Sequence, residues 1–217
     1  MRLKKTAGLI TSCAMMTVGV ASAQDGEELL IGGALSLTGV QAPLDTPGFL
    51  GAEVAVDYLN DNGGILGRQV NFVNIDGKSD PVTVGNIAVE LIDRGAELMV
   101  APCDFDFGGP ASREAQEAGM VGISTCASDP LYSSWSLGDK QFTLSMWNTT
   151  MGAVAADFAC EEKGWKKAYV VTDQFIAYTK SLSKYFQQHY QDIGCEVILE
   201  DTYTNGCLLY TSPSPRD

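Results

Sequence analysis

The sequence lacks the residue patterns of most catalytic and metal sites. It has a single histidine, His189, and no Gly-x-Ser-x-Gly elbow, P-loop or dinucleotide fingerprint. The stretch Asp104–Gly108 begins like a calcium loop, but Ala115 stands where that loop requires a bidentate glutamate. Neither Cys103 nor Cys126 has a plausible general base to make it a nucleophile. The sequence therefore predicts a binding protein rather than an enzyme, with no metal and no cofactor.

Basic residues are also scarce. The chain has 14 Lys and Arg against 27 Asp and Glu, for a net charge of −13. Nucleic acids and anionic membranes are bound mainly through Lys and Arg, which neutralise phosphate. The charge balance therefore excludes nucleic acid as an expected partner.

Long apolar runs are absent except at the start. Three basic residues (Arg2, Lys4 and Lys5) precede an uncharged run over Thr6–Val20, and Ala21–Ala23 has the small-x-small pattern of a cleavage site. This order is typical of a secretory signal peptide, which we assign to residues 1–23. No later apolar run is long enough to span a bilayer. We expect an exported, periplasmic protein.

Ile10–Cys13 offers an alternative, because it resembles a lipobox in which Cys13 would be lipidated. Only residues 6–12 would then separate the last lysine from the cysteine, which is short for an apolar core. Cleavage after Ala23 is the preferred prediction, and a lipoprotein through Cys13 is the alternative.

The last residues differ sharply from the rest. Cys207–Asp217 matches, codon by codon, the translation of a transposase-type sequencing adapter. We therefore interpret residues 207–217 as not native and expect the original reading frame to have continued beyond Gly206.

Apolar periodicity between the two ends alternates between strand and helix. Asp80 and Pro81 form a typical helix start, and Gly63–Gly64 and Gly95 are typical helix ends. Alternation of this kind predicts an α/β fold with parallel sheets. The predicted strands are Leu29–Leu37, Gln69–Ile75, Leu98–Ala101, Val121–Ser124, Ala168–Thr172 and Glu196–Glu200. The predicted helices are Pro47–Asn62, a helix from Pro81 to Gly95, Pro110–Ala118, Thr149–Lys163 and Ala177–Asp192.

Ligands of such sheets bind outside the carboxyl ends of the strands. The loops there cover residues 36–46, 76–80, 103–108, 125–130 and 173–178. The most unusual loop places Phe105 between Asp104 and Asp106, so that it offers an aromatic face and negative charge. We expect Asp104 or Phe105 to face the cleft. Ser128 could hold a ligand oxygen, or Ser128 or Asp129 could only cap the turn before Pro130.

Four cysteines lie between the leader and the foreign end: Cys103, Cys126, Cys160 and Cys195. In an exported chain an even number suggests disulfides, and the spacing matches no zinc site. Cys160 and Cys195 could meet at one end of a lobe. Cys103 and Cys126 end neighbouring strands, where a disulfide and two free thiols beside the pocket are equally open.

A family resemblance rests on motifs whose order and spacing agree jointly, although each is weak alone. They are Leu35-Ser36-Leu37-Thr38-Gly39, Gly51-Ala52-Glu53 with Val56-Asp57 and Asn60, Gly63-Gly64-Ile65-Leu66-Gly67-Arg68, Ser79-Asp80-Pro81, Glu117-Ala118-Gly119 and Tyr178-x-Lys180-Ser181-Leu182. Over residues 28–206 the chain resembles the periplasmic solute-binding proteins of branched-chain amino acid and amide ABC transporters.

The resemblance implies a type I periplasmic-binding fold, in which two Rossmann-like lobes close on a small solute. It implies a first lobe over 24–144, and a crossover with the start of an incomplete second lobe over 145–206. The family's ligand-holding loops match Asp104-Phe105 and Cys126-Ala127-Ser128, and its second-lobe aromatic matches Tyr178. The family's ammonium-binding acid would lie beyond Gly206.

One departure concerns the ligand. Amino-acid binders commonly have serine in the first loop, where this chain has Phe105 between two aspartates, so a ligand carboxylate would meet like charge. An amine, amide, polyol or aromatic compound is as credible as an α-amino acid. The resemblance implies a monomeric protein that delivers its solute to an inner-membrane ABC permease. The alternative is an exported ligand-sensing receptor domain that feeds a signalling partner.

Overall fold

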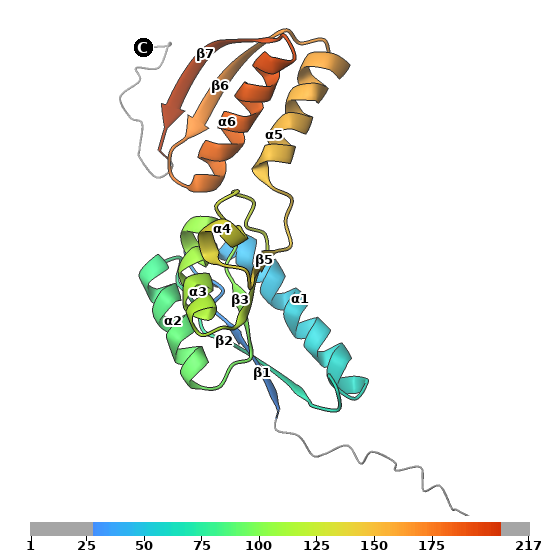
Figure 1. The fold of residues 1–217 in the computed structure, drawn as a ribbon, viewed down its shortest axis with the longest axis vertical. Helices are drawn as coiled ribbons and strands as arrows, with labels where there is room; N and C mark the ends of the chain where they lie inside the picture. The colour runs from blue at the N-terminus through green and yellow to red at the C-terminus, as the bar shows by residue number, and fades with distance from the viewer. Residues whose placement is uncertain (1–27, 205–217) are drawn as a thin grey trace, which may run out of the picture.

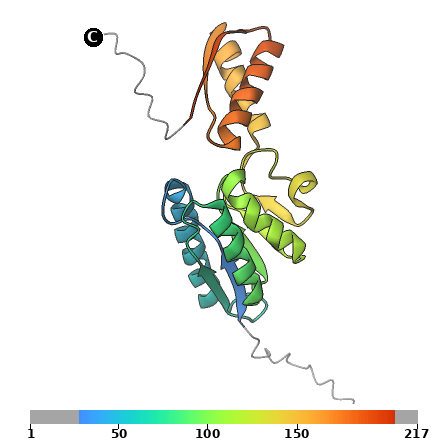
Figure 2. The same cartoon turned by 90° about the vertical axis from the view of Figure 1, so that its left-hand side faces the viewer.

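The computed structural model describes residues 28–204, which form two α/β units stacked along the long axis (Figures 1 and 2). We call residues 28–144 the first lobe and residues 145–204 the second lobe. The predicted signal peptide, the alternative lipidation site at Cys13 and the segment 207–217 lie outside the described residues. No helix within 28–204 is long and apolar enough to cross a membrane.

The first lobe is built on a five-stranded sheet in the order β2-β1-β3-β4-β5, and every neighbouring pair of strands is parallel. Its strands are β1 (Leu29–Gly33), β2 (Val70–Asn74), β3 (Leu98–Ala101), β4 (Val121–Ser124) and β5 (Gln141–Thr143). The parallel sheet confirms the predicted fold class. All five strands point their carboxyl ends at the same edge, which faces the second lobe (Figure 1).

Helices cover the two faces of this sheet unequally. Helices α2 (Pro81–Asp93) and α3 (Phe105–Glu117) pack together on one face, and α1 (Ala42–Asp61) lies on the other (Figures 1 and 2). The main core lies under α2 and α3 and contains Ala34, Val84, Ile87, Ala88, Leu91, Ala96, Met99, Ala101, Ala111 and Ala115. The Asp80 side chain caps α2 by accepting from Thr83 N at 2.7 Å, as the sequence predicts.

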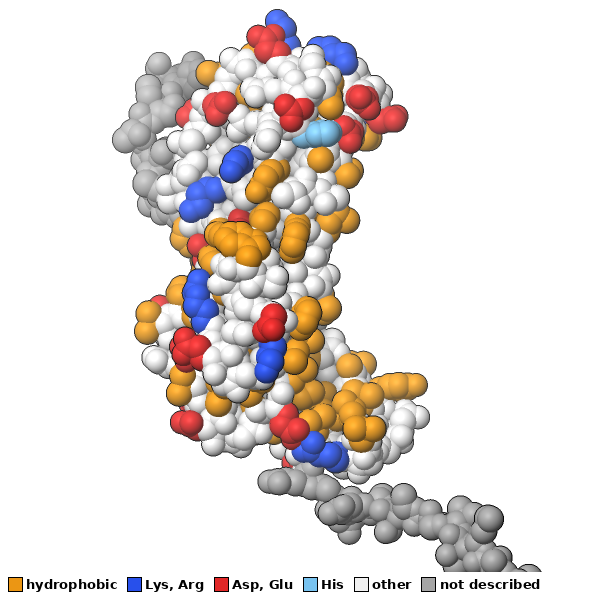
Figure 3. Space-filling view, in the orientation of Figure 1, with side chains coloured by type: hydrophobic (Ala, Val, Ile, Leu, Met, Phe, Trp, Pro, Cys, Tyr) orange, Lys and Arg blue, Asp and Glu red, His pale blue; other side chains and the backbone are white. Residues whose placement is uncertain are grey.

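Helix α1 is sparsely covered within the described residues. Leu50, Val54 and Tyr58, which the periodicity places on one apolar face, are 53%, 69% and 68% exposed. Hydrophobic side chains therefore gather along this helix at the lower right of the surface (Figure 3). The fully buried position of α1 is Asp45, in its first turn beside the pocket.

The second lobe follows a short connection after β5. Helix α5 (Asn148–Asp157) continues as a π-helix, η1 (Phe158–Glu162), and then come β6 (Lys167–Asp173), α6 (Ala177–Asp192) and β7 (Glu196–Tyr203). Strands β6 and β7 pair in parallel, and α5 and α6 pack beside each other (Figure 1). The small core contains Ala156, Cys160, Tyr190 and Cys195, and a disulfide joins the two cysteines.

Two helix starts differ from the predictions by five residues. Helix α1 begins at Ala42 rather than Pro47, and α3 begins at Phe105 rather than Pro110. Proline is favoured at a first helical position, but each of these prolines lies inside its helix and removes one backbone hydrogen bond. The sequence also gave no prediction for α4 (Ser134–Leu137) or β5, which are too short to show a period.

Candidate functional site

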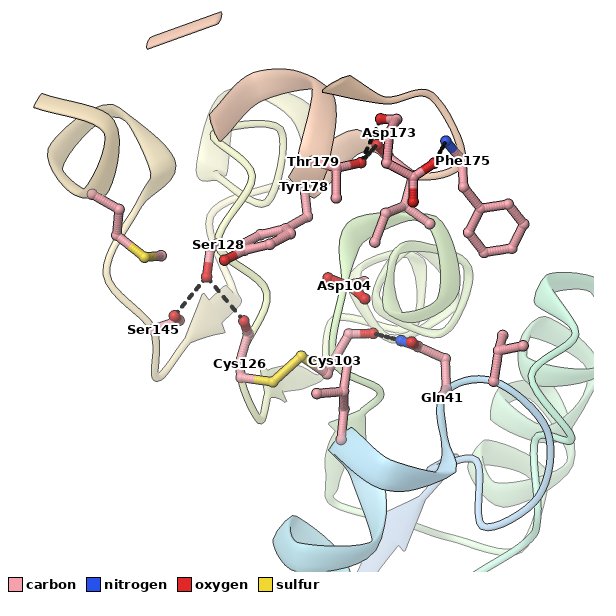
Figure 4. Close-up of a pocket in the computed structure, with 14 residues that line it drawn as sticks. Gln41, Cys103, Asp104, Cys126, Ser128, Ser145, Asp173, Phe175, Tyr178 and Thr179 are labelled. Carbon is pink, nitrogen blue, oxygen red and sulfur yellow. Dashed lines mark hydrogen bonds between the residues drawn. A yellow bond between two sulfur atoms is a disulfide. The ribbon is translucent and has the colours of Figure 1, made fainter. Parts of the chain in front are cut away.

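A pocket of about 530 Å³ lies between the two lobes, at the carboxyl ends of β1, β3, β4 and β6 (Figure 4). Both lobes contribute to its wall. It is lined by Val40, Gln41, Leu44, Cys103, Asp104, Cys126, Ser128, Ser145, Met151, Asp173, Phe175, Ile176, Tyr178 and Thr179. Four of the five predicted loops contribute residues to the pocket wall, and the loop 76–80 contributes none. The rule that ligands bind at the carboxyl ends of parallel strands therefore locates the pocket.

A disulfide forms part of the first-lobe wall. Cys103 follows β3 and Cys126 follows β4, and their Cα atoms are 4.7 Å apart (Figure 4). Both residues line the pocket. The bond therefore ties together the two first-lobe loops that the sequence analysis associates with a ligand.

Ser128 connects the first lobe to the crossover. Its hydroxyl lies 2.7 Å from the Ser145 hydroxyl and donates to the Cys126 carbonyl at 3.2 Å (Figure 4). Its carbonyl accepts from Asn148 N at 2.8 Å, at the start of α5. Ser128 thus faces the pocket at the point where the chain leaves the first lobe.

Asp104 is the most unusual residue of the pocket. It is the N-cap of α3 with a positive φ of 66°, and its side chain makes no capping hydrogen bond. The side chain is 4% exposed, and its Oδ2 has no hydrogen-bond partner. Burial raises the pKa of Asp104, the Gln41 amide lowers that pKa, and the charge of Asp106 raises it further. Gln41 is held by a bond from Nε2 to the Cys103 carbonyl at 2.6 Å.

A second buried acid, Asp45, lies beneath this wall. Its Oδ1 accepts from Cys103 N and its Oδ2 from Ser36 N, both at 2.8 Å. Burial outweighs these two bonds and raises the pKa of Asp45 to about 6. Asp45 fixes the loop after β1 to the loop after β3.

The second-lobe wall comes from the end of β6 and the start of α6. Asp173 is 8% exposed, and its Oδ1 accepts from Phe175 N at 2.9 Å. The Thr179 hydroxyl donates to the Asp173 carbonyl at 2.8 Å. The Tyr178 ring extends from α6 toward Ser128 across the pocket (Figure 4).

The predicted site residues divide into two groups. Asp104, Cys126, Ser128 and Tyr178 line the pocket, whereas Phe105 and Ala127 do not.

Phe105 lies in the first turn of α3, and its ring packs against the buried cluster of Ala127, Tyr132 and Leu137. The Arg113 guanidinium also lies over this ring, 5.5 Å from the ring centroid. Because α3 begins at Phe105, the helical backbone turns this ring toward that cluster, and of these two neighbours Asp104 alone lines the pocket.

Sequence reasoning did not single out Gln41, Asp173 or Met151. Gln41 and Asp173 lie in loops that the strand-end rule marks, so their position was available from the sequence, but nothing distinguished them from their neighbours. Within residues 28–204, no group of three His, Cys, Asp or Glu side chains is placed to hold a metal ion.

A pocket between two parallel α/β lobes, at the ends of their strands, defines a class of two-lobed solute-binding proteins. The sequence model of the periplasmic binding protein family matches residues 28–213, and the chain belongs to this family.

Individual relatives agree with this assignment. A Leu/Ile/Val-binding protein of Citrobacter freundii is 24% identical over 210 residues, which is 95% of this chain and 55% of that protein. The chain thus spans about half the length of the curated relatives it matches.

Solved structures share the fold. The branched-chain amino acid binding protein LivJ of Streptococcus pneumoniae, in complex with isoleucine, aligns with a TM-score of 0.76 and 25% identity. The alignment covers 83% of this chain and 51% of that chain. A solute-binding protein of R. palustris in complex with benzoate aligns with a TM-score of 0.74 and 23% identity, over 85% and 51% of the two chains.

Proposed function

We propose that the chain is the solute-capturing part of an ABC importer. It holds one small polar solute between its two lobes and delivers it to a permease in the inner membrane. The observation that carries this proposal is the pocket of about 530 Å³ whose wall comes from both lobes. A solute bound there contacts both walls at once, so binding favours closure and excludes water.

The relatives support a small organic ligand. They are described as Leu/Ile/Val-binding proteins, and two solved structures hold isoleucine and benzoate. An amino acid, amide, amine or aromatic acid is therefore the proposed solute class. Asp104, Cys126, Ser128 and Tyr178 are the proposed contacts, and binding requires no metal, no cofactor and no covalent chemistry.

The proposed division of the chain into segments follows its resemblance to the family. We assign residues 1–23 to a cleaved signal peptide, 24–144 to the first lobe and 145–206 to the crossover and second lobe, with a periplasmic, monomeric mature protein. Residues 207–217 are assigned to adapter sequence.

A solute screen tests the proposal. Purified full-length protein is tested by thermal shift and calorimetry against amino acids, amides, amines and aromatic acids. We expect one class to bind, and Tyr178→Ala to weaken that binding by about tenfold, because it removes an aromatic wall of the pocket. Tyr58→Ala is the matched control, since Tyr58 is 68% exposed on α1, away from the pocket. Absence of binding by every class would reject the proposed function.

Transport is a separate step of the proposal. Deleting the gene should abolish uptake of the labelled solute by cells, and restoring it should recover uptake. Uptake that continues unchanged, together with tight binding by the purified protein, would point to a sensing role.

A further inference from the structure

We propose that the solute carries a protonated amine, which Asp104 binds, and no carboxylate next to it. This inference rests on the proposed function and names the ligand class of the same pocket. It depends on three features of the described residues: an unpaired buried carboxylate, the charge of the lining residues and the aromatic wall of the second lobe.

The unpaired carboxylate is the first feature. Asp104 is 4% exposed, lines the pocket and leaves its Oδ2 without a donor. Buried polar atoms in folded proteins nearly always have a partner, and a buried charge without one is costly. An aspartate at an N-cap ordinarily satisfies itself by accepting from the first helical N–H groups. The Asp104 side chain does not cap α3, so its free oxygen remains available to a ligand donor.

The backbone at Asp104 supports the same interpretation. Its φ of 66° lies in the left-handed region, which is strained for a non-glycine residue. Such strain persists where the surrounding structure imposes it, and it is frequent at ligand sites. Burial raises the pKa of Asp104, and the Gln41 amide, fixed on the Cys103 carbonyl, offsets part of that increase. The residue is thus held in a conformation that presents its carboxyl group to the pocket, where an ammonium group would stabilise the ionised form.

The charge of the lining residues is the second feature. The pocket residues include two acids, Asp104 from the first lobe and Asp173 from the second, and among those described there is no Lys, Arg or His. Figure 4 shows the two acids on either side of the space between the lobes. A ligand carboxylate there would meet like charge without a basic partner, whereas an ammonium group would be attracted from both sides.

The aromatic wall is the third feature. Tyr178 and Phe175 line the second-lobe side of the pocket. The face of an aromatic ring attracts a cation, and the rest of an amine is apolar enough to pack against it. The pocket therefore offers an anion for the ammonium group and an apolar surface for the carbon skeleton.

A charge series tests the inference. Two carbon skeletons are used, each as an amine, a zwitterion, an acid and an amide: isoamylamine, leucine, isocaproate and isocaproamide, then tyramine, tyrosine, hydroxyphenylpropionate and its amide. Binding to the full-length protein is measured by calorimetry. We expect an amine to bind about 10- to 100-fold more tightly than its matched acid and zwitterion, the ratio for one charge-assisted hydrogen bond.

Variants then test whether Asp104 is the residue that binds the amine. Asp104→Asn should reduce the affinity for the amine by about 10- to 100-fold and narrow the difference between amine and acid. Asp57→Asn makes the same change at an exposed position of α1. It should leave unchanged both the affinity for the amine and the difference in affinity between amine and acid. If Asp104→Asn does not fold, the charge series on the unmodified protein decides.

The outcomes separate this inference from the proposed function. A matched acid or zwitterion that binds as tightly as the amine, or an amine that Asp104→Asn binds normally, overturns the inference and leaves the proposed function standing. A wider screen that finds only solutes without a cationic group would also overturn the inference and leave the proposed function standing. Absence of binding by any solute overturns both.

Discussion

Asp45 is the residue on which the geometry of the first-lobe wall depends most directly. It is fully buried in the first turn of α1, and its two oxygens accept from Ser36 N and Cys103 N. The two N–H groups belong to loops that follow different strands. One side chain therefore satisfies two buried donors and fixes the spacing of the loops around the pocket.

Replacing Asp45 should destabilise the protein. In Asp45→Ala both N–H groups lose their acceptor, and each orphaned buried donor costs about 1–3 kcal/mol. We expect the free energy of unfolding to fall by about 2–6 kcal/mol, measured by urea denaturation. Asp57→Ala removes the same group from an exposed position of α1 and should change stability by less than about 0.5 kcal/mol. Equal effects of the two substitutions would contradict the assignment.

Asp45 should also give the stability a characteristic pH dependence. Burial raises its pKa from 3.8 to about 6, so between these values the native state holds a proton that the unfolded chain has lost. The stabilisation that the protonated Asp45 gives the folded state is therefore fully present below pH 3.8. It declines by about 3 kcal/mol in total as the pH rises to 6, and it changes no further above that pH.

The comparison with Asp45→Asn isolates this contribution. The lowered pKa values of Asp76 and Asp80 act in the opposite direction in both proteins, and they cancel in the difference. We expect the stability of the unmodified protein relative to the variant to decline from pH 4 to pH 6. Parallel curves over this range would show that Asp45 does not titrate there.

At the scale of elements, periodicity and caps predicted most of the fold. The bounds of β3, β4 and α6 match the predicted ones, and α2 starts at the predicted cap, because short apolar runs bounded by turn residues, a helical period and a strong cap are local signals. The starts of α1 and α3 could not be predicted this way. There the tertiary structure continues a helix across Pro47 and Pro110, against a local preference.

The same limit applies to the site. The loops were predictable from the alternation of strands and helices, because the carboxyl ends of parallel strands share one edge. The direction of a side chain within a loop was not. Phe105 and Asp104 are adjacent in sequence. At the start of α3, however, the Phe105 ring packs against a buried cluster, whereas the Asp104 carboxylate lines the pocket.

The two disulfides allow the pocket to be separated from general stability. They close loops of similar length, with sequence separations of 23 and 35, so each contributes about 3–4 kcal/mol by the chain-entropy model. Only Cys103 and Cys126 line the pocket; Cys160 and Cys195 are in the second-lobe core. Ligand affinity should therefore depend on the first bond far more than on the second.

Paired serine variants test this difference. Replacing Cys103 and Cys126 should lower both the melting temperature and the affinity for the best solute of the screen. Replacing Cys160 and Cys195 should lower the melting temperature by a similar amount and leave the affinity of the folded protein nearly unchanged. Non-reduced peptide mapping of the unmodified protein should show both linkages. An equal loss of affinity in the two variants would remove the distinction.

At the scale of the whole molecule, hydrogen bonds between described residues of the two lobes hold one lobe against the other. The crossover provides Asn148 N, which donates to the Ser128 carbonyl, and Ser145, which meets the Ser128 hydroxyl. Away from the crossover, Asp106 of α3 reaches the second lobe, where its Oδ2 accepts from Ala177 N at 2.7 Å. Ala177 is the first residue of α6, so a first-lobe carboxylate satisfies a free donor at the start of a second-lobe helix.

This contact should stabilise the arrangement of the lobes seen in the structure without touching the solute, because Asp106 is not among the residues that line the pocket. Asp106→Ala leaves the Ala177 donor to water and should shift the lobes toward an open state. An acceptor at a helix start contributes about 0.5–2 kcal/mol, so solute affinity should fall by about 2- to 30-fold, mainly through faster release. Small-angle scattering should show a more extended protein with less change on solute addition.

Glu117→Ala makes a comparable charge change at the exposed far end of α3 and should have neither effect. Unchanged affinity and scattering in Asp106→Ala would show that closure depends on the solute and the crossover alone.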